Sequence, residues 1–465
     1  MSVAFTDGVE TIARFVVNTA ISEGTRQRAR ARAAMAFVDT CGVMLAGTGE
    51  PAARIAQSMA AEDGVGHCRV VGTSIATSPS LAAFANGVAA HALDYDDMCF
   101  VSLAHPSCVL VPALLAAGEI AQSGAATLLD AYVIGFEIEC RLGLVMNPRH
   151  YHQRGWHCTS SIGTLGAAAA VARVLGLDAQ ATRHALGIAA SSACGLKENM
   201  GSMVKPLHAG MAARNGITAA QLAKRGFTAS PHAIDGPQGY LAAMDSEHRS
   251  LDAVVADLGT RWEINESGVT VKLYPSCAAT HPPLDALAEI VRRERFTSHQ
   301  VAAIDVEVDS MTPRLLIHPN PSTGLEAKFS MPFCAAAAVV FPQIGIDTFT
   351  PESIGHPDVQ ALMPRVSLRA NVEFDTAAPL SQARVTVRLR DGREWSQHAD
   401  GARGYPGRLT DEELSAKFAD CAARTLGTSA ARDAWNALIA WFAGTQGGDV
   451  RAVTAIIAER VPSPR

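Results

Sequence analysis

The residues that could do chemistry gather first in the segment HALDYDDMCFVSLAHPS, residues 91–107. Between two apolar stretches it carries three aspartates and a histidine: Asp94, Asp96, Asp97 and His105. Pro106 suits the first position of a helix, which sets His105 at the helix start beside its partial positive charge. Because three carboxylates this close repel one another, at least one requires a cationic partner. The pattern predicts an acid–base site.

A histidine or lysine stands at or near an expected helix start in three further segments. These residues are His157 before an alanine-rich run, Lys205 before Pro206, and Lys272 and His281 on either side of a proline-containing turn. Helix N-termini carry unpaired N–H groups, so added cationic or donor side chains suit anions such as carboxylates. If the segments converge in space, they predict a site for a small polycarboxylate.

The lysines and the remaining histidines have structural alternatives. Lys205 lies in the uncharged segment GSMVKPLHAG, and the following proline predicts an extended backbone that presents its ammonium to the helix start. Lys272 stands between two apolar residues and could instead be an edge-strand lysine that prevents aggregation. His208 and His281 fit either a substrate contact or a structural histidine.

Six segments, in order, resemble motifs of the MmgE/PrpD family. They are DYDD…HPS at 94–107, RGWH at 154–157, KPLHAG at 205–210, KLYPSCAATH at 272–281, GLEAKFS at 324–330 and LTDEEL at 409–414. The family includes 2-methylcitrate dehydratase, cis-aconitate decarboxylase and iminodisuccinate epimerase. The resemblance covers nearly the whole chain. It implies an enzyme that needs no metal or organic cofactor and is typically a homodimer.

The family's reactions make or break a bond at a carbon beside carboxylates, so a base must move a proton and cations must hold the developing charge. With the resemblance, we assign Asp94, His105, His157 and Lys205 as catalytic and Lys272, His208 and His281 as substrate-binding. One of His105 and His157 is then the base and the other the acid, and the sequence leaves open which. Met98 departs from the family pattern, because the matching position in the decarboxylase branch resembles a threonine.

The leading prediction is a cofactor-independent lyase that hydrates or dehydrates a 2-methylcitrate-like hydroxy acid. The first alternative is an epimerase or decarboxylase acting on a dicarboxylate or tricarboxylate of the iminodisuccinate or cis-aconitate type. A second alternative of another class is a non-catalytic polycarboxylate-binding protein, which Met98 and Cys99 leave open.

Bulk properties narrow the class of protein. The 465 residues are 48% hydrophobic and 18% charged, which predicts a compact globule with a large core. The net charge of −6 argues against nucleic acid or an anionic membrane as a partner. The ten cysteines include no CxxC pair, and the N-terminus has no signal-peptide pattern, so we expect reduced thiols in a cytoplasmic protein. Metal and dinucleotide signatures are also absent from the sequence.

Two patterns of apolar residues, one with helical periodicity and one with alternation, predict the architecture. Helical periodicity predicts helices at 51–62, 78–93, 106–122, 125–147, 159–175, 178–194, 207–224 and 233–244, and again over 411–459, with a strand only at 67–72. Between them, alternation predicts strands at 301–310, 366–374 and 383–392, with helices at 282–293, 325–341 and 357–363. We therefore expect a mainly α protein with an all-α domain, 1–265 plus 405–465, and a smaller α+β lid domain, 266–404. The catalytic residues of the first domain should face Lys272 of the second.

Overall fold

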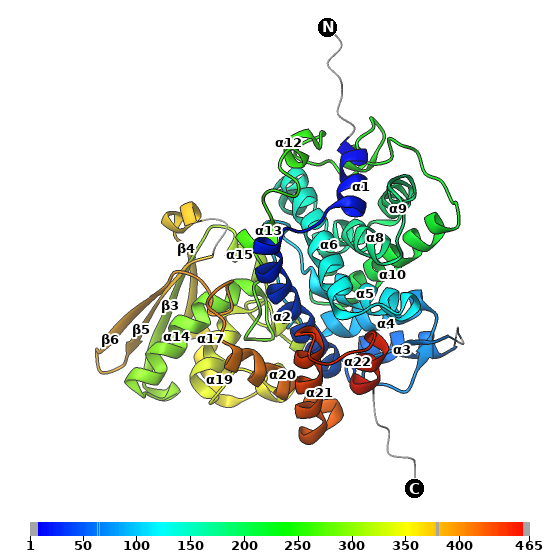
Figure 1. Cartoon of the computed structure of the whole chain (residues 1–465). Helices are drawn as coiled ribbons and strands as arrows, with labels where there is room; N and C mark the ends of the chain where they lie inside the picture. Colours follow the sequence, from blue (N-terminus) through cyan, green and yellow to red (C-terminus); the bar gives the residue numbers. More distant parts are fainter. Residues whose placement is uncertain (1–7, 63, 65, 378–380, 459–465) are drawn as a thin grey trace. The chain divides into compact units, whose positions relative to one another are not determined.

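The computed structural model describes residues 8–62, 64, 66–377 and 381–458. The chain divides into two compact units (Figure 1). The first unit comprises Met1–Ala92, Asp96–Thr270 and Thr410–Arg465, and the second comprises Leu93–Tyr95 and Val271–Leu409. Helices dominate and a small sheet lies in the second unit, which confirms the predicted fold class. The outer ends of the expected domains, 1–7 and 459–465, lie outside the described residues.

The first unit is built almost entirely of helices. They are α1 (Gly8–Asn18), α2 (Glu23–Gly47), α3 (Pro51–Glu62), α4 (Pro79–Ala92), α5 (Ser107–Ala121), α6 (Ala125–Met146), α7 (Cys158–Ser161), α8 (Gly163–Val174), α9 (Ala179–Ser192), α10 (Val204–Lys224), α11 (Tyr240–Ala243), α12 (Asp252–Val255), α13 (Glu263–Glu266), α20 (Asp411–Leu426), α21 (Thr428–Phe442) and α22 (Val450–Ile457). The expected long helices match these closely. The expected helix at 233–244 is wrong except for α11, because Gly236, Pro237 and Gly239 interrupt it.

Small residues let the helices that carry the candidate residues approach closely. A Cβ atom built on Gly87 of α4 would lie 2.8 Å from the Cα of Gly210 in α10. A Cβ on Gly210 would lie 2.6 Å from the carbonyl oxygen of Phe84. Such distances leave no room for a side chain, so the two backbones pack directly against each other. This packing places the C-terminal turn of α4 beside the N-terminal half of α10.

The remainder of the first unit contains a buried charge pair and a short hairpin. Asp39 interrupts the apolar face of α2, and its carboxylate lies 2.7 Å from the ammonium of Lys417 in α20. Both side chains are buried, so the pair joins the C-terminal helices to α2. The expected strand at 67–72 is limited to β1 (Cys68–Arg69), which pairs with β2 (Ala76–Thr77), a strand that the sequence did not predict.

The second unit is an α+β structure. Its sheet has the order β4-β3-β5-β6, formed by β3 (Val301–Val308), β4 (Val366–Ala370), β5 (Ala383–Leu389) and β6 (Glu394–Ala399). Strand β4 is parallel to β3, and the other neighbours are antiparallel. The helices α14 (His281–Glu294), α17 (Met331–Val340) and α19 (Pro357–Leu362) lie beside the sheet in Figure 1. Alternate residues of β5 enter a core shared with α14 and α17, as the alternating pattern predicted.

Three details of this unit differ from the expectations. The strand expected at 366–374 ends at Ala370 because a 3-10 helix, Val372–Ala377, follows it. The helix expected at 325–341 is divided into α16 (Gly324–Ala327) and α17, because the hydroxyl of Ser330 caps a new helix start. Strand β6 was not predicted, and its exposure alternates between partly and fully exposed residues, so it carries little apolar signal.

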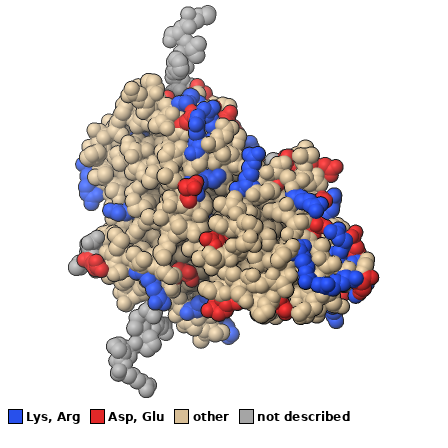
Figure 2. Space-filling view, turned by 180° about the vertical axis from the view of Figure 1, so that it is seen from behind, with Lys and Arg blue, Asp and Glu red and all other residues tan. Residues whose placement is uncertain are grey.

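The surface and the helix lengths bear on possible partners. Among the described residues, no helix is both long enough and apolar enough to cross a membrane. On the face shown in Figure 2, basic and acidic side chains are interspersed and large areas carry neither. That face therefore has no continuous basic surface of the kind that binds nucleic acid.

The contact between α4 and α10 generates a prediction about stability. Gly87→Ala should lower the free energy of unfolding by about 1–3 kcal/mol, since the new methyl group meets backbone that cannot move aside. Urea denaturation measures the change. The matched control is Gly24→Ala in α2, where no atom lies within 4 Å of the added Cβ and stability should be unchanged or slightly higher. Equal stability of the two variants would contradict the close packing.

Candidate active site

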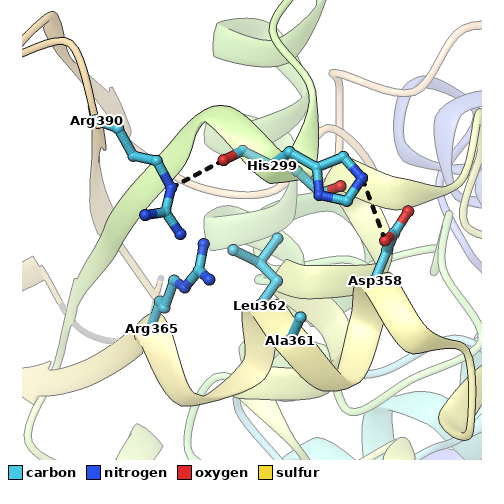
Figure 3. A pocket seen from close by; sticks show the side chains of 7 residues that line it. His299, Asp358, Ala361, Leu362, Arg365 and Arg390 are labelled. Atoms are coloured by element: carbon cyan, nitrogen blue, oxygen red, sulfur yellow. Dashed lines mark hydrogen bonds and ion pairs between the residues drawn. The ribbon is translucent and has the colours of Figure 1, made fainter.

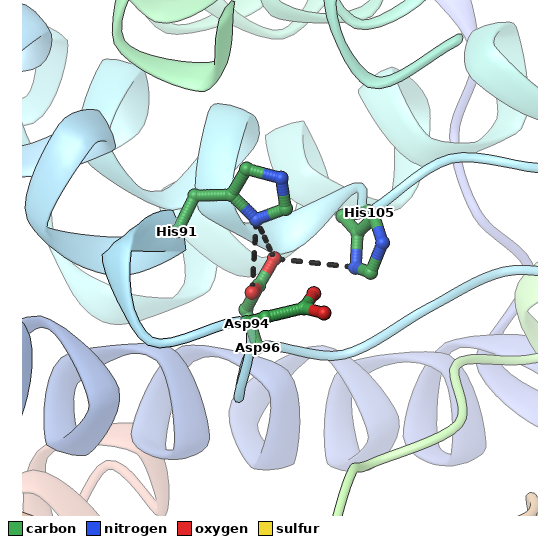
Figure 4. Close-up of side chains that lie close together, drawn as sticks. All are labelled: His91, Asp94, Asp96 and His105. Atoms are coloured by element: carbon green, nitrogen blue, oxygen red, sulfur yellow. Dashed lines mark hydrogen bonds and ion pairs between the residues drawn. The ribbon is translucent and has the colours of Figure 1, made fainter. Parts of the chain in front are cut away.

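The site is organised around Asp96, in the loop between α4 and α5. The Nδ1 atom of His91, in the last turn of α4, lies 2.8 Å and 2.9 Å from the two carboxylate oxygens of Asp96. The Nδ1 atom of His105 lies 3.4 Å from the same carboxylate (Figure 4). Burial alone would raise the pKa of Asp96, but His91 and His105 outweigh it and hold this pKa well below its usual value. Asp96 is therefore a buried anion.

His105 is fixed in one tautomer. Its Nδ1 atom lies 2.8 Å from the carbonyl oxygen of Asp97, which can only accept a hydrogen bond. The proton of the neutral ring is therefore on Nδ1, and the lone pair is on Nε2. The backbone N–H of His105 donates to Oγ1 of Thr159 in α7 at 3.0 Å. Helix α5 begins at Ser107 with Pro106 as its cap, one residue later than the sequence predicted.

His157 and His208 form a second pair of imidazoles. Their Nδ1 atoms are 3.0 Å apart, so one donates and the other accepts. His157 caps α7, as its position before the alanine-rich run predicted. Burial, followed by the charges of His91, Lys205 and His208, holds the pKa of His157 well below its usual value. Both rings therefore remain neutral near pH 7, because burial and Lys205 also lower the pKa of His208 to about 4.

His91 belongs to this cluster, although the sequence analysis did not single it out. Its ring is stacked on that of His157 with centroids 5.8 Å apart, and it lies 4.8 Å from the ring of His105. Burial lowers the pKa of His91 to about 3 despite the opposing charge of Asp96. With Nδ1–H donating to Asp96, its Nε2 is a buried acceptor that has no hydrogen-bond partner among the described residues. The segment HALDYD could have pointed to His91, because it places a histidine at the end of an apolar helix and directly before an acidic loop.

Lys205 lies in the first turn of α10, and its charge acts on His91, His157 and His208. The side chain is buried, which agrees with its uncharged neighbourhood. The predicted extended backbone is wrong, since Lys205 is helical and its N–H donates to the carbonyl of Ser202 at 3.2 Å. The turn from Ser202 leads directly into the helix, which overrides the steric preference of a residue before proline.

Asp97 has a different environment from Asp96. It accepts hydrogen bonds from the backbone N–H and the hydroxyl of Ser107, and that hydroxyl is 2.6 Å from the hydroxyl of Tyr132. Burial raises the pKa of Asp97 well above its usual value, because the hydrogen bonds from Ser107 do not compensate for lost hydration. The pKa values of two neighbouring aspartates of one motif are therefore shifted in opposite directions.

Asp94, Lys272 and His281 belong to the second unit. The ammonium of Lys272 lies 2.7 Å from the Asp94 carboxylate and 3.0 Å from its carbonyl oxygen, so the expected cationic partner of an aspartate is present. Lys272 is fully buried and lies outside any strand, so the edge-strand alternative is wrong. His281 is the first residue of α14, and its Nε2 lies 3.3 Å from the carbonyl oxygen of Ser276.

Lys328 is a further residue to which the sequence analysis assigned no role. It lies in the segment GLEAKFS, and its ammonium donates to the carbonyl oxygens of Leu93 at 2.7 Å and Pro275 at 2.8 Å. Within the second unit it therefore ties the backbone before Asp94 to the segment after Lys272. The sequence could have pointed to Lys328, because this lysine lies within GLEAKFS, one of the six segments that resemble family motifs.

Comparison with known proteins identifies the family. The MmgE/PrpD N-terminal domain matches residues 10–250, and the MmgE/PrpD C-terminal domain matches residues 274–441. The chain belongs to the MmgE/PrpD family. The resemblance carried by the six motifs is therefore confirmed.

Several relatives of this MmgE/PrpD chain carry the name of one activity. The cis-aconitate decarboxylase-like protein oryM of Aspergillus oryzae is 29% identical over 76% of this chain and 77% of its own length. Cis-aconitate decarboxylase of Mus musculus is 29% identical over 75% of this chain and 72% of its own length. The Aspergillus terreus enzyme is 26% identical over 76% of each. The prediction of an enzyme is confirmed, and this family member is of the lyase type.

The donor set of the site permits a test for a metal centre. Ligand atoms of His91, Asp96 and His105 lie within 4.8 Å of one another, so their types and spacing would admit a metal ion. However, Nδ1 of His91 already donates to Asp96, and Nδ1 of His105 already donates to a carbonyl. All ten cysteines are free thiols, and none belongs to this donor group. The arrangement fits a proton acceptor better than a metal centre.

The lowered histidine pKa values predict how stability depends on pH. A histidine whose pKa is lower in the folded state binds fewer protons there, so a fall in pH below about 6.5 favours unfolding by about 1.4 kcal/mol per pH unit and group. His208→Gln removes one such group while keeping a hydrogen-bonding side chain. The loss of unfolding free energy between about pH 6.5 and 4.5 should shrink by about 1–2 kcal/mol in this variant.

Denaturation by urea at each pH measures this loss. The exposed His248 provides the control, because His248→Gln removes a histidine outside the cluster and should leave the pH dependence unchanged. An identical pH dependence in wild type and His208→Gln would show that His208 is not held neutral in the folded protein.

Proposed function

We propose that this MmgE/PrpD enzyme is a lyase that acts on a small polycarboxylate by general acid–base chemistry, without a metal or an organic cofactor. The observation that carries the proposal is His105, whose Nδ1 atom is held by a carbonyl oxygen and whose ring lies beside the Asp96 anion. Its side chain keeps 14% of its exposure, whereas those of His91 and Asp96 have none, so His105 is the ring that a substrate can reach.

The base step follows from the tautomer. The lone pair on Nε2 of His105 takes a proton from a carbon beside a carboxylate. The ring then becomes an imidazolium with Nδ1 3.4 Å from Asp96, whose charge stabilises the new cation. Asp96 thus orients the ring of His105 and stabilises its protonated form, as a fixed carboxylate does in other carboxylate–histidine pairs.

The neighbouring cation and neutral rings suit the charge that develops on the substrate. Lys205 supplies a buried ammonium for a carboxylate whose charge grows as the proton leaves. The neutral rings of His157 and His208 can donate hydrogen bonds without adding charge. Since burial keeps His157 neutral, it serves better as a neutral donor than as an acid protonated in the resting enzyme. We assign the base role to His105 on this ground.

Three finer reactions use this set of residues. The first is dehydration or hydration of a 2-methylcitrate-like hydroxy acid, in which a second group must protonate the hydroxyl that leaves as water, a role that falls to His157 if His105 is the base. The second is decarboxylation of a cis-aconitate-like tricarboxylate, which the names of the relatives favour; there carbon dioxide leaves and a protonated ring must deliver a proton to the substrate carbon. Epimerisation of an iminodisuccinate-like dicarboxylate needs the same base and no leaving hydroxyl.

The remaining assignments are part of the same proposal. Asp94 and Lys272 act as one buried ion pair, so removing either would leave a buried charge without its partner. Asp94 as a catalytic residue, and Lys272, His208 and His281 as substrate contacts, stay predictions. The homodimer that the resemblance implies and the cytoplasmic location also stay predictions.

A substrate panel tests the reaction. Methylcitrates, citrate, cis-aconitate and iminodisuccinate are each incubated with the enzyme in deuterated buffer and followed by NMR. Loss of a carboxyl carbon signal identifies decarboxylation. A new alkene signal identifies dehydration, and a new signal from a carbon that bears a hydroxyl identifies hydration. Inversion of the configuration at a carbon of the substrate identifies epimerisation. A binding protein without a working base would bind a polycarboxylate yet catalyse neither turnover nor deuterium exchange.

Substitution of His105 and Lys205 should affect different kinetic constants. His105→Gln should lower kcat by roughly 10²–10⁴ with little change in KM, since it removes the group that moves the proton. Lys205→Met should raise KM and lower kcat to the extent that the bound carboxylate gains charge in the transition state. The control is His248→Gln, which removes an exposed histidine that is not part of the cluster and should behave as wild type. Near-normal kcat in His105→Gln would transfer the base role to another histidine.

Chelation tests the absence of a metal requirement. Because the Nδ1 atoms of His91 and His105 are engaged within the protein, we expect activity to be unchanged after dialysis against EDTA. Metal analysis of the active protein should find no stoichiometric zinc or iron. Activity that is lost with EDTA and restored by one added metal would assign these side chains as ligands instead.

A further inference from the structure

A hollow in the second unit is lined on one side by two arginines. Its lining consists of Ser298, His299, Asp358, Ala361, Leu362, Arg365 and Arg390. In Figure 3 the guanidinium groups of Arg365 and Arg390 both extend into the same space, and His299 and Asp358 stand on the other side. The volume of the hollow is about 50 Å³, far below the roughly 300 Å³ at which pockets for drug-sized ligands begin. A ligand here would be small.

Both arginines are anchored on the same short segment of backbone. Nη1 of Arg365 donates to the carbonyl oxygen of Val301 at 2.8 Å, and Nε of Arg390 donates to that of His299 at 2.9 Å. The backbone N–H of Arg390 also donates to the carbonyl oxygen of Gln300 at 2.8 Å. These bonds hold the side chains in place before any ligand arrives, which lowers the entropic cost of binding.

The charges of these two arginines are not balanced by carboxylates. Within the described part of the chain, neither Arg365 nor Arg390 forms an ion pair. Other arginines of the same sheet do: Arg369 and Arg388 pair with Asp305, Arg384 with Glu307 and Arg393 with Asp391. The one carboxylate in the hollow, that of Asp358, lies 3.5 Å from Nε2 of His299. Two guanidinium groups therefore share a hollow with one carboxylate.

We propose that Arg365 and Arg390 bind a small oxyanion, through a carboxylate or phosphate group, in this hollow. A guanidinium group presents parallel N–H donors that match the oxygens of either group, and the N–H donors not used on the backbone remain available. The hydroxyl of Ser298 adds a polar group to the lining. This is a second ligand site, and it does not rest on the lyase reaction proposed above.

Isothermal titration of the full chain tests the site with two probes, inorganic phosphate and acetate, at constant ionic strength. Arg365→Gln/Arg390→Gln should weaken binding of the preferred probe at least tenfold, because both charge-assisted contacts are lost. The matched control, Arg369→Gln/Arg384→Gln, removes the same charge from the same sheet and should change the affinity less than twofold. Preference for phosphate or for acetate identifies the source of the oxyanion as a phosphate or a carboxylate group.

A variant that gains affinity keeps the test independent of folding defects. Asp358→Asn removes the one carboxylate in the hollow and should tighten binding of the same probe a few-fold, since it removes a repulsion. Equal affinities in wild type, the arginine double variant and Asp358→Asn would overturn the proposal, as would the absence of binding to the wild-type chain. Lyase activity in the arginine double variant should remain at the wild-type level, so this result is separate from the outcome for the catalytic proposal.

Discussion

A carboxylate with no contact with water stays ionised only where donors surround it, and this constraint on Asp96 organises the candidate site. The two imidazoles beside it cannot be placed freely, because His91 must present Nδ1–H to the carboxylate and His105 must lie close enough to share its charge. The cost of burying the anion is therefore met by fixed ring orientations. The same requirement leaves Nε2 of His105 as the proton acceptor.

Burial acts in the opposite direction on Asp97. With only hydroxyl and amide donors, its carboxyl does not recover the hydration it loses, and its pKa rises. The two aspartates are consecutive in sequence, yet the pKa of Asp96 is lowered and that of Asp97, which lies in a hydrogen-bonded network with Ser107 and Tyr132, is raised. The difference lies in the neighbours, since a charged form is stabilised only by opposite charge or several donors.

Close helix packing provides the precision that such pairs need. Glycines at the contact between α4 and α10 bring the backbones together, which sets His91 near the segment that carries Lys205 and His208. Charges in contact with water do not need such partners, as the arginine pair Arg365 and Arg390 of the second unit illustrates. Arg390 is exposed and Arg365 is partly exposed, so water hydrates their charges without a carboxylate partner, and this is why we propose them as ligands for an anion.

The sequence by itself determined the elements whose periodicity is local. Helices such as α3 and α6 and the strands β3 and β5 were predicted closely because hydrophobic spacing of 3.6 or 2 residues is readable within one segment. Their assembly into a mainly α protein and its family followed from the same pattern and from six motifs. The helix expected at 233–244 failed where glycine and proline outweighed the apolar pattern, and β6 was missed because it buries almost nothing.

Only the tertiary structure decided what the candidate residues do to one another. His105, His157, Lys205 and His208 were predicted from their types and helix-start positions, but His91 was not, because a histidine at the end of an apolar helix is usually structural. The protonation states of Asp96 and Asp97, the tautomer of His105 and the pairing of Lys272 with Asp94 could not be predicted. Each depends on burial and on partners that the fold supplies, up to 178 residues away along the chain for Lys272 and Asp94. Local sequence carries periodicity, whereas the energy of a buried charge is set by everything that surrounds it in space.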